Sequence, residues 1–91
     1  MATVAITLKI MPNSPETDLD QISKAVDEKI TNFGGGVGKT ETEPVAFGLK
    51  ALVIIFTMPE EKGSTESLEQ EISELSGVSS VQVTDVRRTL G

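Results

Sequence analysis

The chain has 91 residues, of which 37% are hydrophobic, and a formal net charge of −6, and it contains neither cysteine nor histidine. This length fits one domain, and we expect residues 1–91 to form a single one. The missing residue types exclude disulfides, thiol nucleophiles, serine–histidine triads and nearly all zinc sites.

The charge and the aromatic content argue against direct binding of nucleic acid. Three phenylalanines are the chain's whole aromatic content, so platforms on which bases stack are missing, and an acidic protein makes few phosphate contacts. No stretch approaches the roughly 20 apolar residues that cross a bilayer. A signal peptide would have a basic region before its apolar residues, and this N-terminus has none. We therefore expect a cytoplasmic protein with no membrane contact that binds a protein or a small ligand.

The first third of the chain predicts a strand followed by a helix. Residues 3–10 alternate apolar and polar side chains, the pattern of a strand with one buried face. Pro12 and Pro15 are expected to end this strand, because proline cannot donate a hydrogen bond to a sheet. Thr17 is then predicted to cap a helix that ends near Phe33. The apolar stripe of this helix consists of Leu19, Ile22, Val26 and Ile30.

The middle of the chain predicts a loop and two strands joined by a turn. Residues 34–38 include four glycines and are expected to form a flexible loop. Residues 39–43 are polar and are followed by Pro44, which favours a strand at the edge of a sheet. After a turn at residues 46–48, residues 49–56 form the longest apolar run, with a single polar member, and are typical of a central strand.

The last third predicts a second helix and a final strand. Ser64 or Thr65 is expected to cap the helix, and Gly77 to stop it. The apolar face of this helix consists of Leu68, Ile72 and Leu75. Residues 78–88 are predicted to form the strand. Within it, Val86 falls on the opposite face from the two valines before it, which favours a bulge or a change of environment near the preceding threonine and aspartate.

These elements give the order βαββαβ, which the right-handed crossover rule folds into a ferredoxin-like sandwich. We therefore predict an α+β fold with a four-stranded antiparallel sheet, whose first and third strands are central, and two helices on one face. The other face of the sheet is then open. Thr3, Ala5, Thr7 and Lys9 are expected to point toward it from the first strand, together with apolar residues of the third. Those apolar residues form either a contact patch or a surface shaded by neighbouring side chains.

Two patterns that imitate chemical sites have simpler explanations. Residues 34–40 approach the phosphate-loop pattern, but its first glycine falls on Phe33, and the segment follows a helix and opens a strand, the reverse of the required context. The glutamates of the second helix could be taken for metal ligands, but such a run usually forms a solvated outer face. We predict no metal site from either. The glutamates in question are Glu66, Glu69, Glu71 and Glu74.

A basic pair stands out at the end of the last strand. Residues 63–86 contain five acidic residues and no basic one, and Arg87 and Arg88 follow directly. Arginine stays charged in any environment and donates in a fork that suits a carboxylate or a phosphate. The pattern alone is compatible with a binding tip and with a pair that keeps the end of the chain soluble.

The turn at residues 44–50, Pro-Val-Ala-Phe-Gly-Leu-Lys, carries a family signal. Together with the hydrophobic strand, the acidic connection, the glutamate-rich helix and the closing residues 78–83 that follow it, this turn resembles the guanine-nucleotide exchange domain family of translation elongation factor 1-beta. The short form is similar to the archaeal members. The resemblance covers essentially the whole chain, and the fold of that family is the sandwich predicted above.

The resemblance implies a factor that accelerates GDP release from elongation factor 1-alpha, the GTPase that delivers aminoacyl-tRNA during translation elongation. Such a factor has no covalent chemistry of its own and needs no cofactor. In eukaryotic relatives a lysine near the C-terminus reaches the magnesium and phosphate region of the GTPase, and the resemblance places Arg88 there, with Arg87 as the alternative. The implied partner-binding residues are Pro44, Phe47, Lys50 and Arg87.

Two alternatives stay open from the sequence. Phe47 is either an apolar anchor for the partner or a core side chain that closes the turn. The chain as a whole also fits a small-ligand regulatory domain of the amino-acid-binding type, which shares the βαββαβ order. Such domains usually bind their ligand after the first strand, where this chain has residues 11–15.

Overall fold

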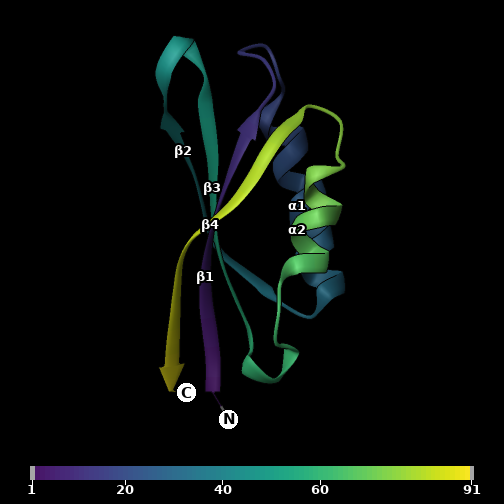
Figure 1. Ribbon diagram of the computed structural model, residues 1–91, viewed down its shortest axis with the longest axis vertical. Helices are drawn as coiled ribbons and strands as arrows, with labels where there is room; N and C mark the ends of the chain where they lie inside the picture. The colour runs from purple at the N-terminus through teal and green to yellow at the C-terminus, as the bar shows by residue number, and fades with distance from the viewer. Residues whose placement is uncertain (1, 91) are drawn as a thin grey trace.

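The computed structural model of the protein describes residues 2–90 and shows the predicted order of elements (Figure 1). The strands of its sheet run antiparallel in the order β2-β3-β1-β4, and both helices cover one face of it. This confirms the ferredoxin-like sandwich with central first and third strands. The elements are β1 (Ala2–Pro12), α1 (Leu19–Phe33), β2 (Gly36–Pro44), the 3-10 turn η1 (Ala46–Gly48), β3 (Lys50–Pro59), the 3-10 turn η2 (Glu60–Lys62), α2 (Glu66–Ser73) and β4 (Val78–Leu90).

The hydrophobic core lies between the sheet and the two helices. Alternation along β1 and β3 sends every second side chain toward the helices, and the apolar stripes of α1 and α2 meet them there. Phe56, Leu8 and Ile54 are fully buried, so the central strands supply the largest side chains of the core. The buried members are Ile6, Leu8, Ile10, Ile22, Val26, Ile30, Leu52, Ile54, Phe56, Met58, Leu68 and Ile72.

Of the two alternatives predicted near Thr84, a bulge or a change of environment, the structure shows a bulge, and it decides which way the arginines point. Leu8 pairs with Val83 but Thr7 pairs with Asp85, so Thr84 is the extra residue. The bulge reverses the parity of the strand beyond it, so that Val86 lies opposite Ile6 on the helix side of the sheet. Arg88, two residues further, lies on the helix side as well, and Arg87 lies on the open side.

Capping of α1 differs from the prediction. Thr17 does not cap the helix; Asp18 does, since its Oδ1 accepts hydrogen bonds from the backbone N–H groups of Asp20 at 3.0 Å and Gln21 at 3.3 Å. The Thr17 hydroxyl instead donates to the side-chain oxygen of Asn13 at 3.3 Å. The cap therefore lies one residue later than expected, because the hydroxyl of the threonine is bonded within the turn before the helix.

Replacing Asp18 by alanine is expected to lower the free energy of unfolding by about 1 kcal/mol, because two N–H groups of the first turn lose their acceptor. Urea titration followed by circular dichroism measures it. Asp20→Ala is the matched control, since it removes a carboxylate from the same turn without removing a cap. Equal losses in the two variants would show that general charge effects, and not capping, act at Asp18.

The predicted loop at residues 34–38 is shorter than expected, because β2 already begins at Gly36. Gly34 ends α1 with a φ of 103°, a left-handed conformation suited to glycine. Gly35 passes so close to the sheet that a Cβ there would lie 2.9 Å from the backbone oxygen of Thr57 and 3.0 Å from Cγ2 of Ile30. These glycines therefore serve a tight helix-to-strand junction, and the prediction of a flexible loop over the whole segment was wrong.

At the second helix the structure separates the two candidate caps. Ser64 Oγ accepts a hydrogen bond from the backbone N–H of Glu66 at 3.1 Å, whereas the side chain of Thr65 makes no cap bond and donates to Glu69 Oε2 at 2.7 Å. The helix ends at Ser73, and Gly77, with a φ of 90°, forms the turn that leads into β4. Gly77 therefore serves the connection after the helix and not the last helical turn.

The open face of the sheet is shaded by its own side chains. Ala51 is fully buried and Val53 and Ile55 are half-buried, although all three point away from the helices. Charged residues of the neighbouring strands close over this row, with ion pairs at 3.8 Å between Lys9 and Glu43 and at 3.0 Å between Lys39 and Glu41. Of the two interpretations left open, the structure favours shading over an exposed contact patch.

No helix within residues 2–90 is long and apolar enough to span a membrane.

Candidate functional site

Phe47 stands at the tip of the β2–β3 hairpin and points into solvent. Its side chain is 93% exposed, which excludes the core position that the sequence left open. Its backbone has a φ of 62° and a ψ of 31°, the left-handed region that bulky side chains rarely adopt. The turn is held by hydrogen bonds from the Val45 N–H to the Leu49 oxygen at 2.9 Å and from the Leu49 N–H to the Ala46 oxygen at 3.3 Å. The hairpin thus presents an aromatic ring at some cost in backbone strain.

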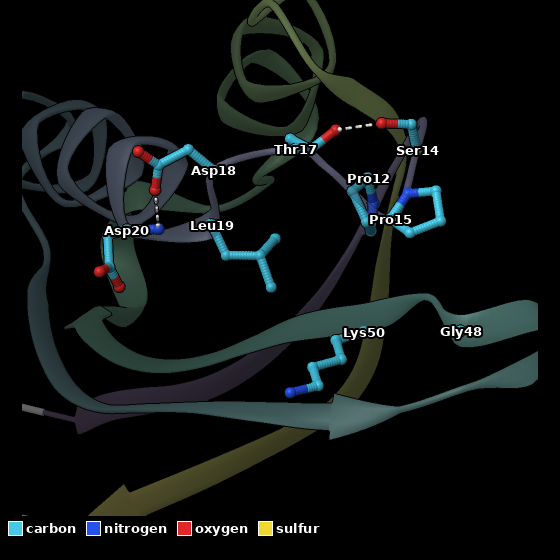
Figure 2. Close-up of a pocket in the computed structure, with 9 residues that line it drawn as sticks. All are labelled: Pro12, Ser14, Pro15, Thr17, Asp18, Leu19, Asp20, Gly48 and Lys50. Carbon is cyan, nitrogen blue, oxygen red and sulfur yellow. Dashed lines mark hydrogen bonds between the residues drawn. The ribbon is translucent and has the colours of Figure 1, made fainter.

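Pro44 and Lys50 form the last pair of β2 and β3 before the turn of the same hairpin. Both are exposed. Lys50 also lines a pocket of about 330 Å³ between the hairpin and the start of α1, and Figure 2 shows its amine on the side away from the β1–α1 loop. The remaining lining residues are Pro12, Ser14, Pro15, Thr17, Asp18, Leu19, Asp20 and Gly48. We call residues 44–50 the hairpin tip.

Arg87 and Arg88 lie near the end of β4, and each has an acidic partner. Arg87 Nε lies 2.9 Å from Asp85 Oδ2, two residues back on the same face of the strand. Arg88 Nη2 lies 3.0 Å from Oε2 of Glu60, which belongs to η2. The two arginine side chains are 78% and 66% exposed, so both guanidinium groups remain accessible. We call Arg87 and Arg88 the arginine end.

The structure does not bring the hairpin tip and the arginine end together. They lie at opposite ends of the long axis of the molecule, which measures 42 Å (Figure 1). Arg88 and Met58 both pair with Val4, and Met58 lies eight residues beyond Lys50 on β3, about 26 Å at roughly 3.3 Å per residue. No small ligand reaches both ends. A surface that engages both must belong to another macromolecule.

Glu60 is the residue that the sequence analysis missed. It lies in the acidic connection between the hydrophobic strand and the second helix, and its contact with Arg88 joins residues 28 positions apart. The acidic residues that were weighed as metal ligands do not gather: within residues 2–90 no group of three or more acidic side chains is placed to hold a metal ion. The chemistry that the described residues offer is therefore that of charged and aromatic contacts at two separate points.

Comparison with known families shows which family the chain belongs to. The profile of the EF-1 guanine nucleotide exchange domain matches residues 5–89. The chain belongs to this family. The match covers both the hairpin tip and the arginine end, and it confirms the resemblance that residues 44–50 carried in the sequence.

Relatives in the EF-1 exchange family match the chain from end to end. Elongation factor 1-beta of Methanothermobacter thermautotrophicus is 41% identical over 90 residues, which is 99% of this chain and 100% of that protein. Elongation factor 1-beta of Methanobrevibacter smithii is 42% identical over the same shares, and that of Metallosphaera sedula is 40% identical over 97% of each chain. Over nearly its whole length the chain is thus similar to archaeal elongation factor 1-beta.

Solved structures that resemble this protein share its fold at much lower identity. The ACT domain of a GTP pyrophosphokinase from Chlorobium tepidum has a TM-score of 0.58 and 11% identity, covering 87% of this chain and 95% of that one. The de novo designed protein Foldit4 has a TM-score of 0.57 and 18% identity, covering 99% and 97%. A natural domain and a designed one share this architecture, so the fold alone does not identify an exchange factor.

Proposed function

We propose that the protein accelerates GDP release from elongation factor 1-alpha. The observation that carries this proposal is the match of the exchange domain to residues 5–89, joined by relatives named elongation factor 1-beta over 97–99% of the chain. We also propose that it acts in the cytoplasm, where translation elongation takes place. It works by binding alone, without covalent chemistry of its own.

The physical basis of exchange is linkage between two ligands of the GTPase. An exchange protein binds the nucleotide-free GTPase more tightly than the nucleotide-bound form. It must therefore weaken the binding of the nucleotide by the same ratio of affinities. Magnesium bridging the phosphates is a large part of that binding, so displacing the ion is an effective way to loosen GDP. The protein therefore needs a rigid body that holds a cation at one point while it grips the partner at another.

The arginine end supplies the cation in this proposal. A guanidinium brought near the magnesium site repels the ion and competes for its oxygen ligands. Arg88 takes this role, and Arg87 is the alternative. Two features support Arg88: the bulge in β4 turns it toward the helix side, and its partner Glu60 lies on another element, whereas Arg87 is paired within its own strand.

The hairpin tip supplies the main contact with the partner in this proposal. Phe47 is an exposed aromatic ring on a constrained turn, which is the kind of residue that dominates binding energy once a partner covers it. Pro44 and Lys50 flank it as the pair next to the turn, with Lys50 adding a positive charge. Because tip and arginine end lie at opposite ends of the molecule, we infer that the partner contacts both along the length of the sheet.

The wild-type protein is expected to increase the rate of GDP release from elongation factor 1-alpha at least tenfold, since couplings between ligands commonly span about 5- to 150-fold. Release of a fluorescent GDP analogue into excess unlabelled GDP measures this rate. The GTPase without the factor gives the basal rate, and chelation of magnesium by EDTA gives the rate to compare with full loss of the ion.

The pocket beside the β1–α1 loop is a feature that favours the alternative, a small-ligand regulatory domain. It lies where such domains usually bind, and acidic and basic groups line it. However, one carboxylate oxygen of Asp18 already accepts the hydrogen bonds that cap α1, and Lys50 is exposed on the hairpin. The pocket thus lacks a buried polar group aimed at a ligand, and exchange remains the function that the molecule supports best.

A further inference from the structure

The ion pair between Arg88 and Glu60 joins two elements that meet at the lower end of the molecule in Figure 1. Glu60 directly follows β3 and begins η2, while Arg88 lies on β4, on the far side of β1. Nη2 of Arg88 lies 3.0 Å from Oε2 of Glu60, and the side chains are 66% and 44% exposed. The carboxylate therefore neutralises the guanidinium in the free protein without hiding it from solvent.

Both partners are brought into place by specific backbone features. The bulge at Thr84 puts Arg88 on the helix side of the sheet, where η2 lies; without the extra residue it would point to the open face. On the other side, η2 is closed by a hydrogen bond from the Gly63 N–H to the Glu60 oxygen at 3.1 Å. Gly63 has a φ of 74° and a ψ of −123°, a conformation suited to glycine.

A second contact fixes η2 to the end of α1. The amine of Lys62 lies 5.7 Å from the centre of the Phe33 ring, and its side chain covers Gly34, where a Cβ would come within 2.6 Å of Cε of Lys62. Glu60 thus lies on a short turn that follows β3 directly and contacts the end of α1 through Lys62. Arg87 has no such partner, since Asp85 is its neighbour on the same strand. The carboxylate that faces Arg88 belongs to the body of the molecule.

We propose that Glu60 acts as an internal competitor for Arg88, holding its guanidinium until a stronger anionic site displaces it. This inference rests on the proposed function. Any contact that the free factor makes and the complex breaks lowers the affinity of the complex by the same amount. Glu60 is therefore a specificity-determining residue: a lone carboxylate or a sparse anionic surface does not displace it, and a cluster of phosphates and carboxylates does.

Replacing Glu60 by glutamine removes the charge and keeps the shape. The apparent second-order rate of stimulated GDP release, measured at factor concentrations far below saturation, is expected to rise about two- to fivefold, the range that exposed ion pairs support. The gain should shrink as salt is raised, because exposed pairs are screened. Glu71→Gln is the matched control: it removes an equally charged partner from an exposed pair, with Lys29 at 3.6 Å, on α2.

The same substitution in an Arg88→Ala background shows whether Glu60 acts through Arg88. We expect no gain there, and a gain that persists without Arg88 would overturn the inference in favour of simple repulsion. Slower release by Glu60→Gln than by wild type would overturn it too, because Glu60 would then be assisting Arg88. A thermal-unfolding cycle over the four proteins measures the pair without any GTPase, and a coupling of zero would remove its basis.

The proposed function and this inference fail in different ways. If the wild type accelerates release and Glu60→Gln matches it at every salt concentration, the inference falls and the exchange function stands. If the wild type does not accelerate release at all, the exchange function falls, and the inference falls with it.

Discussion

Replacing Arg88 by alanine is expected to reduce stimulated GDP release at least tenfold while the domain stays folded. The loss follows from removing the cation that competes with magnesium, and a tenfold change requires only about 1.4 kcal/mol at the transition to the nucleotide-free state. The fold should survive because the Arg88 side chain is 66% exposed and contacts only the surface residue Glu60 among the described ion pairs. Labelled-GDP release gives the rate, and circular dichroism confirms the fold.

Two companion variants sharpen the Arg88 prediction. Arg88→Lys keeps a positive charge at the same place and should retain most of the activity. Arg87→Ala should lose less than Arg88→Ala, because Arg87 is paired locally and faces the open side of the sheet. An unchanged release rate in Arg88→Ala would refute the role given to that residue, and a large loss in Arg87→Ala alone would transfer the role to Arg87.

Phe47→Gly is expected to change stability and activity in opposite directions. Glycine adopts the left-handed conformation of this residue without strain, so the free energy of unfolding should rise by up to about 1 kcal/mol. Loss of the exposed ring should lower the apparent second-order rate of stimulated GDP release at least tenfold, as expected for an aromatic anchor. Urea titration and GDP release measure the two effects on the same protein.

Two further substitutions at the same position separate strain from contact. Phe47→Asn also tolerates the left-handed conformation and should behave like Phe47→Gly. Phe47→Leu keeps an apolar side chain and the strain, so it should retain more activity and gain no stability. If the glycine variant is as active as the wild type, the hairpin tip does not contact the partner through this ring.

Periodicity and turn chemistry were sufficient to predict the architecture. The alternation in residues 3–10 and the apolar run in residues 49–56 located the two central strands, and the helical stripes located the helices. The right-handed crossover rule then placed both helices on one face of the sheet. The parity break at Val86 even located the bulge. These features repeat over many residues, so an error at one position does not alter the result.

Local details failed where one residue decides the outcome. Thr17 and Asp18 are both good caps, and the choice between them depends on the turn that holds Thr17, which the sequence does not reveal. Gly36 has low strand propensity, yet it pairs with Thr57 of β3, and Gly38 is the extra residue at a register shift between Val37 and Lys39. Tertiary packing overrode local preference at both places.

The candidate site was only partly predictable. The sequence located the hairpin tip and the arginine end, but the exposure of Phe47 depended on a left-handed backbone conformation that the pattern of residues 44–50 does not specify. The sequence did not indicate a role for Glu60, because its contact with Arg88 spans 28 positions and depends on the bulge in β4. Long-range pairs of exposed charges leave no periodic trace in a single sequence.

The measurement that tests the central claim most directly is the rate at which purified elongation factor 1-alpha, loaded with fluorescent GDP and magnesium, releases its nucleotide with and without the wild-type protein. Excess unlabelled GDP prevents rebinding, and the factor is titrated to saturation. An acceleration of at least tenfold that saturates with factor concentration is the predicted result. A release rate that stays at the basal value at every concentration, with both proteins folded, would contradict the account.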